Sequence, residues 1–166
     1  MRTIEVLDKK DYNPDWDRFE RAAVRGIILD GDGKIAMVRS EKFGDYKFLG
    51  GGVRDGECHV DTLVREVREE SGLDVLADSV SPYGKIIELR KGYHEDVVFQ
   101  QTSYYYTCRT EGNAAPTPEE GYEVEYGYQP VWVLPQDAIA VNEKLLGMPE
   151  IGWVERELIV LKELAK

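Results

Sequence analysis

The hydrophobic and polar positions in the first third of the chain predict a β-hairpin followed by a short strand. Residues 22–29 (AAVRGIIL) are mostly apolar and typical of a strand, and residues 30–33 (DGDG) are a strong turn signal. Residues 34–38 then predict the returning strand of the hairpin. A short strand expected over residues 46–49 leads directly into three consecutive glycines at positions 50–52.

Three later segments have sequence features typical of helices. The helix predicted over residues 58–71 has an apolar stripe and is followed by Gly72, which suits a C-terminal cap. Pro135 suits the first turn of a second helix, and an amphipathic third helix is expected over residues 151–165. The stripe of the first helix comprises Val60, Leu63, Val64 and Val67, and that of the last comprises Val154, Leu158, Leu161 and Ala165.

Strands and helices interleave along the chain, which favours an α/β fold. Further strands are predicted over residues 85–89, 97–108 and 131–133, whereas residues 111–122 indicate an exposed loop. Because hairpins take the place of regular βαβ units, we expect a mixed sheet covered by helices on both faces. The length of 166 residues suits one globular domain, so we predict a single domain over residues 1–166.

The composition is that of a folded protein, and no segment predicts a membrane span. Hydrophobic residues make up 42% of the chain, yet no run approaches the roughly 20 apolar residues of a membrane helix. The first residues lack the apolar core of a signal peptide, so a cytoplasmic location is expected. The two cysteines, Cys58 and Cys108, form no C-x-x-C pair, which argues against a disulfide framework and a zinc site.

The chain is strongly acidic, with 32 acidic residues against 21 basic residues and a net charge of −11. Such a surface repels nucleic-acid polymers unless a basic patch is present, and the sequence has no cluster of Lys and Arg. Nucleic acid is therefore not expected as a partner. A phosphorylated small molecule can still bind if divalent cations bridge the like charges.

Three glutamates of the first predicted helix carry the candidate chemistry. Glu66, Glu69 and Glu70 lie at positions i, i+3 and i+4, so their side chains share one helical face beside the apolar stripe. Like charges at this spacing destabilise a helix by roughly a few tenths of a kcal/mol per pair, which indicates a compensating cation. Grouped carboxylates suit Mg²⁺ or Mn²⁺, although three glutamates alone are more often a solvated acidic face.

The residues around these glutamates complete a longer pattern. Arg65 is four residues from both Asp61 and Glu69 and can hold Glu69 in place. Residues 51–73 read GGVRDGECHVDTLVREVREESGL and fill every defined position of the Nudix box, G-x5-E-x7-R-E-U-x-E-E-x-G-U, where U is aliphatic. The sequence therefore resembles the Nudix (MutT-like) hydrolase family, and the resemblance extends from residue 20 to residue 140 or beyond.

This resemblance implies an α/β/α sandwich with a mixed β-sheet and a loop–helix–loop metal site at residues 51–73. It implies that Mg²⁺, with Mn²⁺ as a possible substitute, is held by Glu66, Glu69 and Glu70 and by the backbone carbonyl of Gly50. Glu57 would support the metal shell, and Arg65 would orient the glutamates. The catalytic residues implied are thus Glu66, Arg65 and Glu69.

The general base stays open, because it varies within the family. It is either a box glutamate, of which Glu66 is the first choice, or an acid from a later loop. The later candidates are Glu119, Glu120, Glu123 and Glu125, with Glu120 and Glu123 preferred.

The activity implied is Mg²⁺-dependent hydrolysis of a phosphoanhydride bond in a nucleoside diphosphate derivative. The chain lacks the motifs that mark coenzyme A, NADH, ADP-ribose and dinucleoside polyphosphate enzymes, which leaves a nucleoside triphosphate by elimination. Two alternatives are a non-catalytic Nudix-like nucleotide sensor and an RNA 5′-end pyrophosphohydrolase. The intact box argues against the first and the acidic charge against the second. A homodimer is a reasonable expectation from the family.

A few other residues have possible roles outside the box. His59 follows the helical phase of Glu66 and could contact a phosphate, but a surface histidine is the simpler expectation. Tyr104, Tyr105 and Tyr106 could stack on a nucleobase or only pack in a strand. We expect Trp132 to pack in the core and assign no role to His94.

Overall fold

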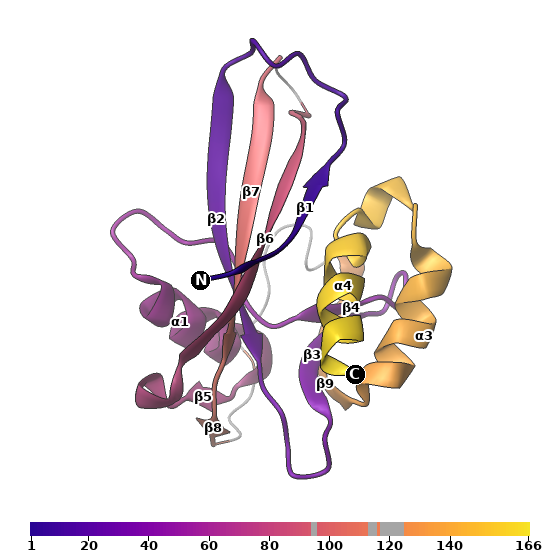
Figure 1. The fold of residues 1–166 in the computed structure, drawn as a ribbon. Coiled ribbons are helices and arrows are strands. Elements are labelled where there is room, and N and C mark those ends of the chain that lie inside the picture. The colour runs from indigo at the N-terminus through magenta and orange to yellow at the C-terminus, as the bar shows by residue number, and fades with distance from the viewer. Residues whose placement is uncertain (94–95, 113–115, 117–124) are drawn as a thin grey trace.

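A computed structural model describes residues 1–93, 96–112, 116 and 125–166. Its strands are β1 (Thr3–Asp8), β2 (Arg18–Ile27), β3 (Ile35–Ser40), β4 (Tyr46–Phe48), β5 (Asp74–Val75), β6 (Ser81–Lys91), β7 (Val98–Thr107), β8 (Thr110–Glu111) and β9 (Tyr128–Val133). Its α-helices are α1 (His59–Ser71), α3 (Pro135–Leu145) and α4 (Val154–Leu164), and two short 3₁₀ turns cover Ala77–Ser79 and Pro149–Ile151. Figure 1 shows α1 on one side of the strands and α3 and α4 on the other.

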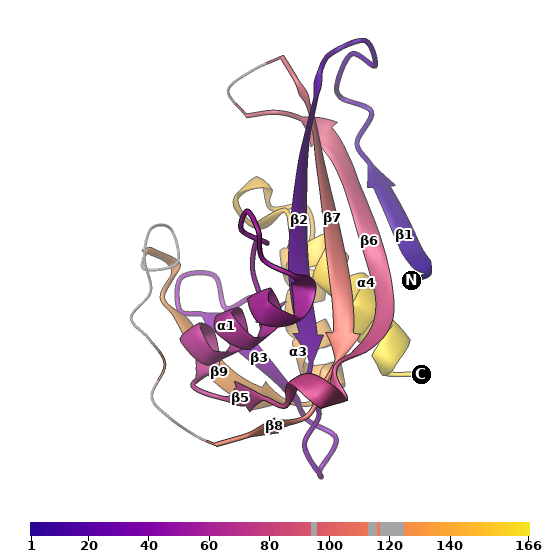
Figure 2. The ribbon, with the colours of Figure 1, turned by 90° about the vertical axis from the view of Figure 1, so that its left-hand side faces the viewer.

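The main sheet is mixed and has the strand order β1-β6-β7-β2. β6 and β7 are antiparallel neighbours, whereas β1 pairs with β6 and β2 pairs with β7 in parallel. A second, antiparallel sheet has the order β4-β3-β9, and β5 pairs with β8. Figure 2 shows the long strands of the main sheet side by side, rising beyond the layer of helices.

The segment after β4 runs along the free edge of β2 and joins the two sheets. The amide of Gly26 donates to the carbonyl of Leu49 at 2.8 Å, and that of Val24 donates to Gly51 at 2.9 Å. Val53 donates in turn to Ala22 at 3.0 Å. The glycine segment 50–52 is therefore fixed against β2 by backbone hydrogen bonds rather than left as a free loop.

Alternation along β2 gives the two faces of the main sheet different neighbours. Val24 and Ile28 pack with Leu63 and Val67 of α1, and all four are buried. Ile27, on the opposite face, belongs to a second buried cluster. That cluster includes Ile86 of β6, Tyr105 of β7, and Val160 and Leu161 of α4. The sheet thus separates the helix that carries the glutamates from the helices at the end of the chain.

The helical expectations are confirmed, and local sequence explains the ends of α1. Cys58 precedes the helix, and its sulfur accepts a 3.4 Å hydrogen bond from the amide of Asp61. Gly72 ends the helix with a left-handed φ of 74°, and its amide donates to the carbonyl of Arg68 at 2.9 Å. Leu63 and Val67 are fully buried as expected, whereas Val60 and Val64 are only partly covered.

The strand expectations are confirmed in position, although the bounds differ. β2 begins four residues before the predicted strand, and β6 extends past residues 85–89 at both ends. The added residues of β2, 18–21, are all exposed, so no buried apolar pattern marks them in the sequence. β1, β5 and β8 were not predicted.

The expectation for Trp132 is wrong. Its side chain is 42% exposed, since this residue lies on the side of β9 that faces away from the buried neighbour Val133. None of the helices among the described residues is long and apolar enough to span a membrane.

We predict that Gly50→Ala lowers the free energy of unfolding by at least about 3 kcal/mol. Gly50 has a φ of 132°, and an added Cβ would overlap the carbonyl oxygen of Val24, which the β2 hydrogen bonds hold in place. Gly56→Ala is the matched control, because φ is 81° there but no atom lies within 4 Å of the added Cβ. Its cost should be about 1 kcal/mol. Urea unfolding measures both, and equal losses would contradict the steric argument.

Candidate functional site

Two glutamates of α1 contact the glycine segment from one side. The side chain of Glu70 is buried, and its Oε2 accepts a hydrogen bond from the amide of Gly50 at 2.7 Å. Glu66 lies so close to Gly51 that a Cβ at Gly51 would collide with its carboxylate. The absence of side chains at Gly50 and Gly51 therefore lets both carboxylates lie against the backbone of the segment.

Arg65 gathers the other carboxylates of the site around a single guanidinium. Its Nε and Nη2 each donate to a different oxygen of Glu57 at 2.8 Å, a bidentate pair. Its Nη1 donates to Glu66 at 2.6 Å and to Glu69 at 3.2 Å. The hydrogen bonds from Arg65 lower the pKa of Glu57 to about 2, and those to Glu57 and Glu66 raise the pKa of Arg65.

The predicted ligands lie close together, but not as a ready cage. Within the described part of the chain, no group of three or more acidic, histidine or cysteine side chains converges as a metal site does. The reason is that Arg65 holds Glu66 and Glu69 while Gly50 holds Glu70. The donor set still fits a hard divalent cation, because carboxylate oxygens on one helical turn face a glycine segment that leaves them room.

An arginine that the sequence analysis missed contacts the same glycine segment from the other side. Arg25 of β2 is 8% exposed, and its Nη1 donates to the carbonyl of Gly50 and, at 3.4 Å, to that of Phe48. Its Nε has no hydrogen-bond partner. Among the described residues it forms no ion pair with a carboxylate, which is a costly state for a buried guanidinium.

Arg21 is a second missed arginine on the same face of β2. A Cβ at Gly52 would lie 3.0 Å from its Nη2, so the guanidinium lies over the segment. Arg21 and Arg25 are four residues apart on a strand, and alternation places them on one face. The sequence contained a signal for both residues, because Arg21 and Arg25 interrupt the mostly apolar segment that leads to the hairpin.

These arginines open onto a cleft of about 730 Å³ between one face of the main sheet and the connection from α3 to α4. Its volume is in the range of a small-molecule site. Six basic side chains and three acidic ones line it, and the basic residues are Lys9, Arg21, Arg25, Lys47, Arg90 and Arg156. The cleft is therefore basic in a protein whose net charge is −11.

A buried ionic network fixes one wall of the cleft to α4. Arg156 donates to Glu157 at 2.8 Å and to Glu88 of β6 at 2.6 Å. Glu157 is fully buried, and its second oxygen accepts from the amide of Phe48 at 3.0 Å. Burial opposes the charge of Arg156, but Glu88 and Glu157 raise its pKa well above the usual value. This arginine is thus neutralised by the fold, unlike Arg25.

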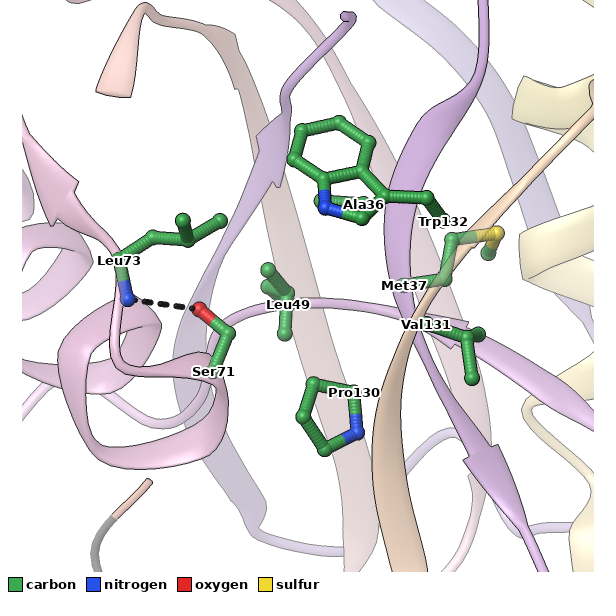
Figure 3. Close-up of a pocket in the computed structure, with 8 residues that line it drawn as sticks. All are labelled: Ala36, Met37, Leu49, Ser71, Leu73, Pro130, Val131 and Trp132. Carbon is green, nitrogen blue, oxygen red and sulfur yellow. Dashed lines mark hydrogen bonds between the residues drawn. The ribbon is translucent and has the colours of Figure 1, made fainter. Parts of the chain in front are cut away.

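A smaller pocket of about 230 Å³ lies beside the C-terminal end of α1. Figure 3 shows Leu73, Leu49 and Pro130 around it, with the amide of Leu73 hydrogen-bonded to the hydroxyl of Ser71 at 3.3 Å. No charged side chain lines this pocket. It offers no group that could bind phosphate, so the basic cleft is the better substrate site.

The remaining candidate residues lie apart from the glycine segment or outside the described residues. The ring of His59 is 2.7 Å from the hydroxyl of Tyr106 and packs on Tyr104 at 4.4 Å between ring centroids. Burial lowers the pKa of His59. Glu125 is exposed and pairs with Lys42. The other later-loop candidates, Glu119, Glu120 and Glu123, and also His94, lie outside the described residues.

Tyr105 is the one tyrosine of the three that faces the cleft side of the sheet, and it is fully buried. Burial raises the pKa of its hydroxyl, which has no hydrogen-bond partner. Tyr105 therefore packs in the core, with an edge-on contact to Phe48 at 5.6 Å, and offers no exposed ring to a nucleobase.

Solved structures with the same fold include a NUDIX hydrolase and a MutT protein. A NUDIX hydrolase from Nitrosomonas europaea superposes with a TM-score of 0.58 at 16% identity, over 89% of this chain and 91% of that one. The MutT protein of Bacillus halodurans gives a TM-score of 0.55 at 15% identity, over 73% of this chain and 72% of its own. These likenesses confirm the α/β fold with its mixed sheet.

The sequence itself establishes the family. The NUDIX domain model matches residues 19–152, so the chain belongs to the Nudix family. Nucleoside diphosphate-linked moiety X motif 6 from Xenopus laevis is 32% identical over 92 residues, which cover 54% of this chain. That match spans only 40% of the Xenopus protein. Nudix hydrolases generally use a divalent metal ion and act on small nucleotide substrates.

We predict that Glu57→Gln lowers stability at neutral pH and that this loss becomes smaller as the pH falls below 4.5. Arg65 holds the pKa of Glu57 at about 2, below the usual value of 4.5, so the ionised form favours the folded state. The stabilisation is complete above pH 4.5 and is lost as pH falls towards 2. Urea unfolding of both proteins from neutral pH to about pH 3 measures the difference. A difference that stays constant over this range would contradict the role of the pair.

Proposed function

We propose that this protein hydrolyses a phosphoanhydride bond in a nucleoside diphosphate derivative and requires Mg²⁺, for which Mn²⁺ can substitute. The observation that carries the proposal is the glycine segment 50–52, which has carboxylates on one side and, on the other, two arginines with no carboxylate partner among the described residues. A pyrophosphate group needs both kinds of neighbour, because cations and guanidinium groups must together balance its charge.

Glu66, Glu69 and Glu70 would hold the cation, with the carbonyl of Gly50, which accepts from Arg25 in this structure, as the further ligand. When bound there, it would neutralise phosphate oxygens and activate a water molecule for attack. Arg65 would keep Glu66 and Glu69 on the side of the segment, and Glu57 would in turn fix Arg65 by its bidentate contact. These two are therefore positioning residues in the proposal.

Arg21 and Arg25 would bind the phosphate oxygens that the cation leaves exposed. The guanidinium of Arg25 is held close to Gly50 and lines the cleft, so its charge lies beside the position proposed for the phosphate. Arg21 is exposed and lies over Gly52, so it can follow the ligand as it enters the cleft. Neither arginine must break an ion pair with a described carboxylate before it binds phosphate.

Glu66 is the group that we assign to accept the proton of the attacking water. It lies against Gly51, and Arg65 Nη1 donates to its carboxylate at 2.6 Å, which fixes the side chain beside the segment. Water then adds across the P–O–P bridge, and the two phosphorylated halves leave. Glu120 and Glu123 remain the alternative base.

The proposed substrate is a nucleoside triphosphate or a related nucleotide, with a nucleoside monophosphate and pyrophosphate as products. The cleft has room for a nucleoside beside the glycine segment, and its basic lining favours a polyanionic ligand. The nucleotide-sensor alternative predicts tight binding without turnover. The RNA 5′-end alternative predicts faster pyrophosphate release from triphosphorylated RNA than from free nucleotides. A homodimer and a cytoplasmic location stay predictions.

We predict that Glu70→Gln reduces Mg²⁺-dependent turnover at least about 100-fold and weakens Mn²⁺ binding. The fold should survive, because the glutamine carbonyl can still accept from the amide of Gly50. Chromatography of products from a panel of nucleotides measures turnover, and calorimetry measures Mn²⁺ binding. Glu143→Gln on α3 is the control, since Glu143 pairs with Lys162 at the surface. Unchanged turnover in the Glu70 variant would overturn the proposal.

Arg21→Gln should lower kcat/KM about 10- to 100-fold without loss of stability, because it removes a phosphate contact from an exposed position. The matched control is Arg18→Gln on the same strand, since alternation places Arg18 on the opposite face, where it donates to Gln100 at 2.9 Å. Steady-state kinetics with the best substrate of the panel compares the two. Equal effects of both variants would remove Arg21 from the site.

A further inference from the structure

We propose that the cleft contains a second anion site at its far end, built on Arg90, which binds a phosphate group that the substrate carries away from the anhydride to be cleaved. Arg90 lies on β6, Tyr93 follows that strand, and Phe99 lies opposite on β7; all three line the cleft. The inference deepens the proposed function, because it rests on that function for the position of the anhydride.

The guanidinium of Arg90 is stacked between two aromatic rings. Its central carbon is 4.0 Å from the ring centroid of Tyr93 and 4.1 Å from that of Phe99. Phe99 stacks in turn on Phe19 of β2, with the centroids 5.9 Å apart. Tyr93 is 80% exposed and Phe19 57% exposed, so this aromatic group lies at the surface and is not needed to fill a core.

Stacking leaves the edge of the guanidinium as the part that can bind a ligand. Two rings lie against the central carbon of the guanidinium and restrict the access of a nucleobase to it, whereas the N–H groups project in the guanidinium plane. Nη1 donates to the carbonyl of Lys91 at 2.9 Å, and no hydrogen bond occupies Nε or Nη2 within the described part of the chain. Such an edge fits two oxygens of a phosphate, and the aromatic rings hold it in place beforehand.

Arg90 differs from its basic neighbours in having no carboxylate partner among the described residues. Lys91, the next residue, pairs with Asp96 at 3.0 Å, and Lys9 pairs with Glu155. On the same strand, Glu88 pairs with Arg156 instead. Carboxylates are therefore close to this end of the cleft, but the fold directs them to other cations and leaves the charge of Arg90 for a ligand.

Strand register places Arg90 at the distance of one nucleoside from the glycine segment. Arg21 is level with Gln101 of β7, and Arg90 is level with Phe99, two residues before Gln101 on that strand. Two strand spacings across and two residues along give a separation of about 12 Å between the Cα atoms of Arg21 and Arg90. Side chains of this length can bind two phosphates attached to opposite ends of one nucleoside. The substrate class inferred is thus a nucleotide with an additional phosphate on its ribose.

The closing experiment compares ligands that differ in one phosphate. Calorimetry measures the affinity of the wild-type protein for adenosine 5′-monophosphate and for adenosine 2′,5′- and 3′,5′-bisphosphate. We expect at least one bisphosphate to bind about tenfold more tightly, which is the contribution of one charge-assisted pair. Arg90→Met keeps an unbranched side chain between the rings, and it should reduce this ratio to about one. Arg109→Met, at an exposed position outside the cleft, should leave the ratio unchanged.

Equal wild-type affinities for all three ligands would overturn the inference, and so would a ratio that persists in Arg90→Met. Unfolding curves that match the wild type show that the variant is folded. A separate arm of the experiment measures the turnover of ADP-ribose and of ADP-ribose 2′-phosphate. The wild type should prefer the 2′-phosphate compound, and Arg90→Met should not. If no compound is cleaved, the binding ratio still tests the Arg90 site while the proposed hydrolysis fails. If cleavage occurs without a binding ratio, only the Arg90 site fails.

Discussion

The close approach of side chains to the backbone of residues 50–52 is the constraint on which the candidate site depends. Glu70 contacts the amide of Gly50 and Arg25 contacts its carbonyl, so one residue is held between an acid and a base. Glu66 and Arg21 repeat the arrangement at Gly51 and Gly52. Any side chain on this segment would separate the two sets of charges, which is the physical reason for three glycines in sequence.

The two sides of the segment balance their charges in opposite ways. On the α1 side, one guanidinium serves Glu57, Glu66 and Glu69, so negative charge is in excess there. On the cleft side, the partners of Arg25 within the described part of the chain are backbone carbonyls, so positive charge is in excess. A ligand that contains both cations and phosphate compensates both excesses at once, whereas a neutral ligand compensates neither.

Local sequence was sufficient to predict the acidic half of the site. Helical periodicity placed Glu66, Glu69 and Glu70 on one face beside the buried Leu63 and Val67, and the structure retains that arrangement. The basic half depends on pairing between distant strands, which no local pattern shows. Arg21 and Arg25 line a cleft only because β2 pairs with β7 and because the chain after α3 covers that face.

The same limit explains the other differences. β1 forms by parallel addition to β6, and its own short polar sequence has no turn signal to mark it. Trp132 was placed in the core on the strength of its size, but its position on β9 was decided by the register with Ala36 of β3. The later-loop acids Glu120 and Glu123 stay a prediction, as does the choice between them and Glu66.

The parallel pairing of β2 with β7 also has a consequence for how the chain folds. β2 pairs with β7 only when Arg18 lies level with Val98. The chain between these two residues includes α1 and the glycine segment. Closing so long a loop costs conformational entropy, and local contacts formed early in folding do not offset this cost. Topologies of this kind therefore fold slowly. We expect α1 to gain helical structure first, and the contacts of Arg25 with Gly50 to form only when the sheet closes.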